Sequence, residues 1–135
     1  MINKNQPVQA VQKQIFVSLK DEKGILPFSM KKGSMAETMN GLDNSEKNLE
    51  FFIRLLEKAM HEVLWYIGAD MLGDSYYERF MFNKSGFLEI LLGEKTEIKA
   101  YFPTSEKAEK FKKALQHALT KLLKEKASAI IKDIK

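Results

Sequence analysis

The chain contains no cysteine, which excludes disulfide bonds, thiolate nucleophiles and cysteine-bound zinc or iron–sulfur sites. It also contains no apolar run that approaches the ~18–20 residues of a membrane-spanning helix. Residues 1–7 lack the apolar core of a signal peptide. From these absences we expect a cytoplasmic protein that has no membrane partner.

No complete catalytic, metal-binding or nucleotide-binding signature occurs in the sequence. The two histidines, His61 and His117, both lie in helical patterns, and neither has the second Glu-x-x-His motif that a helical metal site needs. Asp70 and Asp74 flank a glycine, but no nucleophile or matched carboxylate accompanies them. We therefore expect a protein that is not an enzyme and that uses no metal and no cofactor.

Arginine is scarce, since Arg54 and Arg79 are the only arginines among 22 basic residues. Arginine is the side chain that reads guanine edges and binds phosphate in a bidentate manner, so sequence-specific recognition of duplex DNA is disfavoured. The formal net charge of +4 is unevenly spread: residues 42–74 are net acidic, and residues 105–135 are net basic.

The 135 residues fit one domain with a real core, because 44% of them are hydrophobic. Residues 1–12 are polar and are expected to form a flexible N-terminal arm, so that residues 13–135 form a single α+β domain. Within that domain, alternating and helical periodicities predict strands at 13–20, 76–82, 87–92 and 96–102, and helices at 45–67 and 105–135. Residues 25–30 are expected to be an edge strand or an irregular segment because of Pro27, residues 31–44 a loop with a short helical or strand piece, and residues 68–75 a turn. The predicted fold is an antiparallel sheet of about five strands with two long helices packed on one side.

The two halves of the chain echo each other. Ser45-Glu46-Lys47 recurs as Ser105-Glu106-Lys107 at the start of the second predicted helix, and at the same spacing Phe51 pairs with Phe111 and Leu55 with Leu115. We therefore expect two strand–helix pseudo-repeats, at about 13–67 and 76–135.

The second half resembles a repeat of the Pur family of single-stranded nucleic-acid-binding proteins. The resemblance extends from about Tyr77 to Leu119 and depends on Gly86-Phe87-Leu88 in the meander, Pro103 at the end of a strand, and Phe111 with Ala114-Leu115 in the helix. It implies single-strand binding and four strands before each helix, whereas the periodicity predicts three strands before the second helix and two before the first. The basic residues that the family has in its turns are represented mainly by Lys84.

Two groups of residues are candidates for nucleic-acid binding. Aromatic rings beside cations on a strand can stack on bases and neutralise phosphates together, as Tyr77 with Arg79 and Tyr101 with Lys99 would do. Lysines provide further phosphate contacts at the turn residue Lys84 and at Lys112 and Lys113 in the basic helix. The alternatives are that the lysines form a solvated helix face, because glutamates intersperse them, and that the tyrosines pack beneath a helix.

The C-terminal apolar stripe continues beyond the expected end of the sheet, through Leu123, Ala127, Ile130, Ile131 and Ile134. A stripe of this kind is commonly buried in a second copy or in another protein. The sequence therefore favours a non-enzymatic DNA-binding or RNA-binding protein of low sequence specificity that prefers single strands. The alternative is a protein-interaction adaptor or dimerisation module that uses the C-terminal amphipathic helix. Phosphate binding would weaken steeply with salt, and an apolar interface would respond little.

Overall fold

The computed structural model describes residues 14–28, 35–73, 75–93 and 95–135, with the backbone alone for residues 35–45 and 72. Its elements are β1 (Ile15–Lys20), α2 (Met35–Met60), β2 (Leu64–Leu72), β3 (Ser75–Phe82), β4 (Phe87–Leu92), β5 (Glu97–Phe102), α3 (Ser105–Leu123), a 3₁₀ turn (Lys124–Lys126) and α4 (Ala127–Ile131). The strands form one antiparallel sheet in the order β1-β5-β4-β3-β2. The predicted α+β class, the five strands and the long helices are thus confirmed.

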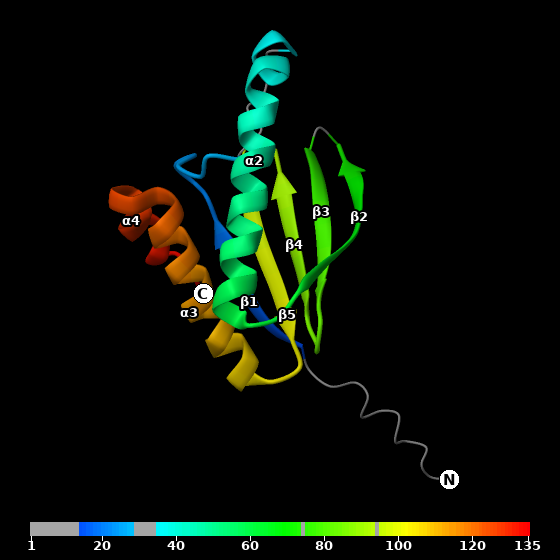
Figure 1. The fold of residues 1–135 in the computed structure, drawn as a ribbon, viewed down its shortest axis with the longest axis vertical. Helices are drawn as coiled ribbons and strands as arrows, with labels where there is room; N and C mark the ends of the chain where they lie inside the picture. Colours follow the sequence, from blue (N-terminus) through cyan, green and yellow to red (C-terminus); the bar gives the residue numbers. More distant parts are fainter. Residues whose placement is uncertain (1–13, 29–34, 74, 94) are drawn as a thin grey trace.

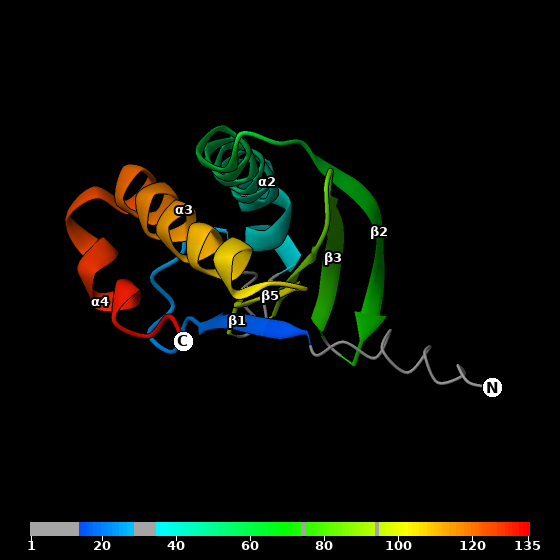
Figure 2. The same ribbon diagram turned by 90° about the horizontal axis from the view of Figure 1, so that it is seen from below.

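The helices form a single layer on one side of the sheet. Figure 1 shows α2 and α3 in front of the strands, and Figure 2, turned by 90°, shows both helices on the same side of the sheet. The core lies between these layers, because alternate residues of β4 and β5, including Leu88, Ile90, Ile98 and Phe102, are buried there. Phe111 of α3 packs against Phe82 and Phe102 with ring centroids 5.8 and 5.2 Å apart. The remaining residues of each strand lie on the other side of the sheet.

The predicted helix at 45–67 is wrong at both ends, because α2 begins at Met35 and ends at Met60. The predicted loop at 31–44 is therefore helical from residue 35, and residues 31–34 lie outside the described part. At the C-terminal end His61 adopts a positive φ of 58°, and the Glu62 N–H donates to the Glu57 carbonyl at 3.3 Å. This is a Schellman-type cap, which normally uses glycine. Residues 64–72 then form β2, so the turn expected at 68–75 is mostly strand.

The segment 25–28 is not a strand. The Asp21 carboxylate accepts the N–H groups of Ile25 and Leu26 at 2.9 and 2.8 Å, so these amides are not available to a β-ladder. Leu26 and Phe28 nevertheless reach the core, where both are buried. The strand that replaces 25–30 as the fifth strand of the sheet is β2.

The single C-terminal helix expected at 105–135 is interrupted. Thr104 caps α3, its hydroxyl oxygen accepting the Lys107 N–H at 3.2 Å. The helix ends at Leu123, because Lys124 adopts a positive φ of 54°. After this turn α4 folds back, and the Lys135 N–H donates to the Ser18 carbonyl of β1 at 3.1 Å.

This return of the chain corrects the predicted partner interface. Ala127 and Ile130 are buried at 2% exposure, and Leu123, Ile131 and Ile134 are partly buried against the same core. The apolar stripe continues past α3 because it covers the molecule's own core beside β1. It is not a free surface for a partner.

The two predicted pseudo-repeats have different structures. Among the described residues, one strand precedes α2, whereas four strands lie between α2 and α3. Ser105 begins α3, but Ser45 lies ten residues after the start of α2. Phe111 is fully buried and Phe51 is 48% exposed, so residues at the same sequence spacing do not occupy equivalent positions. The predicted N-terminal arm, residues 1–12, lies outside the described residues.

A candidate binding face on the sheet

The side of the sheet opposite α2 and α3 is covered by none of the described elements, and we call it the open face. Because residues paired across antiparallel strands share a face, the register gives three rows of side chains that cross all five strands. The first row is Phe16, Tyr101, Phe87, Met81 and Trp65; the second is Ser18, Lys99, Glu89, Arg79 and Gly68; the third is Lys20, Glu97, Leu91, Tyr77 and Asp70.

The first row, which we call the aromatic row, is a continuous apolar band. Phe16, Phe87 and Trp65 are 46–53% exposed, and Met81 is 40% exposed. Phe16 contacts Tyr101 with ring centroids 4.8 Å apart, and the Trp65 indole N–H donates to the Asn83 side-chain oxygen at 3.2 Å. The band therefore exposes several large apolar side chains together, which is unusual for a soluble surface.

The second row carries a hydrogen-bonded network. The Arg79 guanidinium donates to Glu89 at 3.2 Å and to the Tyr77 hydroxyl at 2.7 Å, and it lies 4.5 Å from the centre of the Tyr77 ring. The Tyr101 hydroxyl donates to the other oxygen of Glu89 at 3.4 Å. Burial and the neighbouring Glu89 and Glu97 carboxylates raise the pKa of Tyr101, so its hydroxyl remains a donor at neutral pH. Glu89 thus connects Arg79 to the aromatic row.

The charges of the open face are balanced. Lys20, Lys99 and Arg79 face Glu89, Glu97 and Asp70 in the second and third rows. The Arg79–Glu89 ion pair is partly exposed, with side-chain exposures of 41% and 31%. A phosphate that bound Arg79 would therefore compete with Glu89 for the guanidinium.

Four of the seven predicted nucleic-acid residues, Tyr77, Arg79, Lys99 and Tyr101, lie on the open face. Lys84 lies in the β3–β4 hairpin, next to the end of the sheet that carries the aromatic row. Lys112 and Lys113 do not join them, because α3 lies on the other side of the sheet (Figure 2). Lys112 pairs with Glu109 of the same helix at 3.7 Å.

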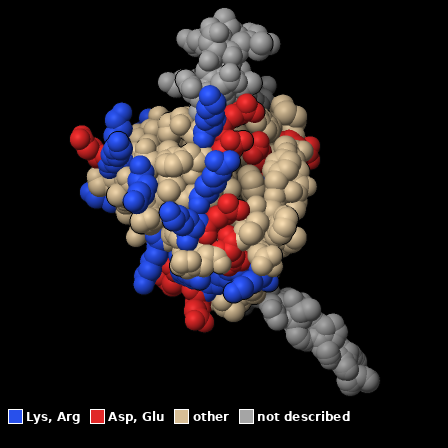
Figure 3. Space-filling view, viewed as in Figure 1, with Lys and Arg blue, Asp and Glu red and all other residues tan. Residues whose placement is uncertain are grey.

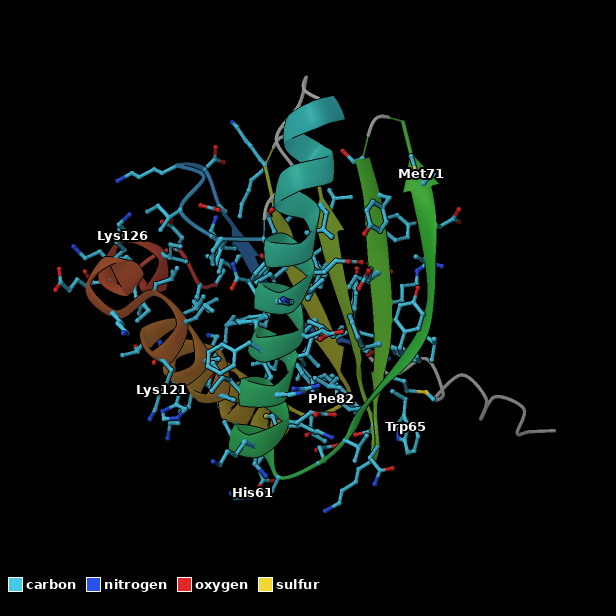
Figure 4. The ribbon with its side chains drawn as sticks, turned by 45° about the horizontal axis from the view of Figure 1, so that its top comes forward. His61, Trp65, Met71, Phe82, Lys121 and Lys126 are labelled. Carbon is cyan, nitrogen blue, oxygen red and sulfur yellow. The ribbon has the colours of Figure 1, made fainter. Side chains whose placement is uncertain are left out.

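Sequence reasoning missed Trp65, Phe87, Met81 and Phe16 as surface residues of one band. Trp65 was assigned to a helix, and the structure places it on the edge strand β2. Figure 4 shows Trp65 and Met71 on β2 at the right of the view, with Lys121 and Lys126 at the left, at the far edge of the molecule. The signal for Phe16 and Met81 was present as alternation with buried neighbours, but their alignment with Phe87 depends on strand register.

Among the residues considered for catalysis or metal binding, those that the structure describes are not clustered. Asp70 is exposed on β2 and accepts the N–H of Met71, while Asp74 lies outside the described residues. His61 and His117 are both exposed, one at the end of α2 and the other in α3. Within the described ranges, no group of three or more His, Cys, Asp or Glu side chains is arranged to hold a metal ion.

The part of the chain that the structure describes contains no helix both long enough and apolar enough to span a membrane. Comparisons with protein-family models, with curated proteins and with solved structures found no match to this chain.

Proposed function

We propose that the protein is a non-enzymatic binding protein whose open face takes up single-stranded nucleic acid, DNA or RNA, with little sequence specificity. The observation that carries the proposal is the aromatic row, a band of exposed rings and a thioether that crosses all five strands. Unpaired bases stack on such rings whatever their identity, at about 1–3 kcal/mol per base. The row spans about 19 Å at an inter-strand spacing of about 4.8 Å, enough for roughly three or four nucleotides.

The resemblance noted from the sequence agrees with this proposal in one respect. It implies four strands before a helix, and β2, β3, β4 and β5 precede α3 in that order. Gly86 supports the meander at a positive φ of 106°, where an added Cβ atom would lie 2.7 Å from the Phe102 ring. These features support the strand arrangement of such a repeat. That the ligand is single-stranded nucleic acid is our proposal.

The balanced charge of the open face sets the expected binding energetics. Lys84, Lys99 and Arg79 would contact phosphates, and Arg79 would first have to leave Glu89. About three phosphate contacts give a slope of about −2 for log K against log salt concentration. Stacking, and not ion pairing, would then supply most of the affinity.

The test is a titration of the protein with an unlabelled oligothymidylate of about 15 nucleotides, followed by the fluorescence of Trp65. Trp65 is the only tryptophan of the chain and lies within the row, so a stacked base is expected to quench it. Phe87→Ala should weaken binding by about tenfold, while Phe51→Ala, an equally exposed ring on α2, should have no effect. Absence of quenching at low salt, or equal effects of the two variants, would refute the proposal.

A protein partner on the same face is a second candidate, and the charge balance favours it. An apolar row flanked by paired charges resembles the centre and rim of a protein interface. Phosphate-binding surfaces differ, because they carry an excess of cations. An apolar partner would bind with an affinity that hardly changes between low and high salt. Such an outcome would replace nucleic acid as the ligand and leave the open face as the binding surface.

A further inference from the structure

A groove of about 320 Å³ runs between α2 and the strands β2 and β3, on the helix side of the sheet. Its apolar lining consists of Leu49 and Ile53 from α2, Phe80 from β3 and Tyr66 from β2. Tyr66 packs edge-on against Phe80 with ring centroids 5.7 Å apart, and it remains 58% exposed. The groove is therefore open, and part of its aromatic floor is accessible.

The helix layer does not extend over this part of the sheet. In Figure 1 β3 and β2 lie to the right of α2, and neither is behind a helix. Among the described residues nine large apolar side chains are exposed, and five of them lie in or next to β2: Val63, Trp65, Tyr66, Ile67 and Met71. Met71 is paired with Tyr76, which places it on the groove side of the strand. A third helix packed beside α2 would cover the Tyr66 and Met71 side chains.

The walls of the groove are acidic. Glu46, Glu50 and Glu57 line it from α2 and Glu78 from β3, and Arg54 is the one basic residue among the described residues of the lining. Figure 3 shows a column of acidic side chains along the β3 side of α2. Glu57 accepts the Leu64 N–H at 2.9 Å, and Glu78 accepts the Tyr76 hydroxyl at 3.4 Å. The groove therefore repels phosphates and is complementary to cations.

The buried part of this charge is unfavourable in the free protein. Burial raises the pKa of Glu78, and the charge of Glu46 raises it further, although the hydrogen bond from Tyr76 acts in the opposite direction. The same environment raises the pKa of Tyr76. A cation placed in the groove would relieve the repulsion between these carboxylates.

We propose that this groove docks a basic amphipathic helix of a partner protein. The lining follows α2 from Glu46 to Glu57, which corresponds to about 17 Å or three helical turns. A partner helix of that length, laid beside α2, would place its apolar stripe on Tyr66, Phe80 and Ile53. Its lysines or arginines would meet the glutamates at the walls, which is the helix-in-groove mode of recognition.

The experiment uses three labelled 18-residue peptides and the full-length protein. The first peptide has leucines at helical spacing and lysines at the other positions, the second has the same composition in an order without an apolar stripe, and the third has glutamates in place of lysines. We expect the first peptide to bind at least tenfold more tightly than the second and the third not to bind, as measured by fluorescence anisotropy. Equal binding of the first two peptides would refute a helix-docking groove.

Variants locate the site. Glu46→Lys combined with Glu50→Lys should weaken the first peptide at least tenfold at low salt, and Tyr66→Ala should weaken it severalfold. Glu50→Lys made alone is the single groove reversal, and Glu109→Lys is its matched charge control, because Glu109 is 65% exposed on α3 and does not line the groove. If Glu109→Lys weakens binding as much as a single groove reversal does, the peptide binds by general electrostatics and the proposal fails. Amide chemical-shift changes on peptide binding should be confined to residues 46–57, 64–72 and 76–80, and changes confined to the open face would also overturn the assignment.

Discussion

Replacement of Lys107 by methionine tests whether a buried ion pair between α3 and the segment after α2 stabilises the fold. The Lys107 ammonium lies 2.8 Å from one Glu62 oxygen and 3.1 Å from the other, and it also donates to the Ser85 carbonyl at 2.8 Å. The two side chains are 13% and 4% exposed, so this is a buried ion pair. It connects the first turn of α3 to the segment that joins α2 to β2 and to the β3–β4 hairpin.

Lys107→Met is expected to lower the free energy of unfolding because it leaves the Glu62 carboxylate unpaired. Methionine preserves the contact with the Phe82 ring, which the ammonium now approaches to 5.3 Å, but it leaves the Glu62 carboxylate buried without its cation. Removal of one partner of a buried pair costs about 3 kcal/mol or more, which corresponds to a fall of about 10 °C in the melting temperature. Lys110→Met, at an exposed position of the same helix, should change the free energy of unfolding by less than about 0.5 kcal/mol.

The pH dependence separates a charge effect from a packing effect. Burial opposes ionisation of Glu62, but hydrogen bonds from Lys107 and from the Lys84 N–H, together with their charges, outweigh burial and lower the pKa of Glu62. In the wild type this contribution to stability is present above the unfolded pKa of about 4.3 and is lost as the pH falls through the lower folded value. In Lys107→Met the ammonium no longer outweighs burial, so the Glu62 carboxylate protonates more readily. The difference in free energy of unfolding between the variant and the wild type should therefore be smaller at pH 3 than at pH 7.

Urea unfolding at pH 7 and pH 3 measures both effects. A double-mutant cycle with Glu62→Gln should give a coupling energy of about 2 kcal/mol at pH 7 and much less at pH 3. If Lys107→Met costs no more than Lys110→Met, or if its cost is the same at both pH values, the ion pair does not stabilise the fold as argued.

Three further changes have expected outcomes. Gly86→Ala should cost about 2–4 kcal/mol in urea unfolding, since its methyl group would meet the Phe102 ring, whereas Gly24→Ala, at a φ of 65° with nothing within 4 Å, should cost only about 1 kcal/mol. Asp21→Ala should cost about 2 kcal/mol by loss of the two amide hydrogen bonds to a buried carboxylate, and a cost below about 0.5 kcal/mol would contradict that role. Glu89→Gln should remove the carboxylate that competes with phosphate for Arg79 and so tighten oligothymidylate binding severalfold at low salt, and an unchanged affinity would show that Arg79 contacts no phosphate.

The elements that were predicted correctly are those determined by residues close together in the sequence. In the strands at 76–82 and 87–92, residues that face the helices alternate with residues of the open face, and a hairpin turn joins the two strands, so the period of two and the turn residues agree. The start of α3 also follows from local pattern, because two hydroxyl residues, Thr104 and Ser105, follow a proline and precede a helical period, and Thr104 is the one that caps the helix. These elements needed no information from distant residues.

The end of α2 could not be read from the same signals. Met60, Leu64 and Ile67 continue a helical period, yet Leu64 and Ile67 belong to a run of β-branched and aromatic residues that also suits a strand. Tertiary structure decides between them: β2 pairs with β3, and the His61 cap closes the helix without a glycine. The prediction of one continuous C-terminal helix was wrong for a related reason. Lys124 ends α3 in a positive-φ conformation, which a lysine in the sequence does not indicate.

The candidate site was predictable only in part. Alternation correctly placed Tyr77 with Arg79 and Tyr101 with Lys99 on shared faces of their strands. Their neighbours on the other strands depend on register, which the sequence pattern does not fix to a single residue across four pairings. The aromatic row and the acidic groove both require β2, the strand that periodicity had assigned to a helix.

The assignment of β2 makes the two proposed surfaces structurally separable. Successive residues of a strand point to opposite faces, so Trp65 belongs to the open face and Tyr66 to the groove, although they are neighbours in the chain. The basic peptide should therefore bind without displacing oligothymidylate, and saturation with oligothymidylate should leave the anisotropy of the labelled peptide unchanged in the presence of protein. The Leu/Lys peptide can also bind the oligonucleotide directly, so a mixture without protein is the control. If oligothymidylate displaces the peptide from the protein beyond that control, both ligands use one surface, and the division of β2 into two binding faces is wrong.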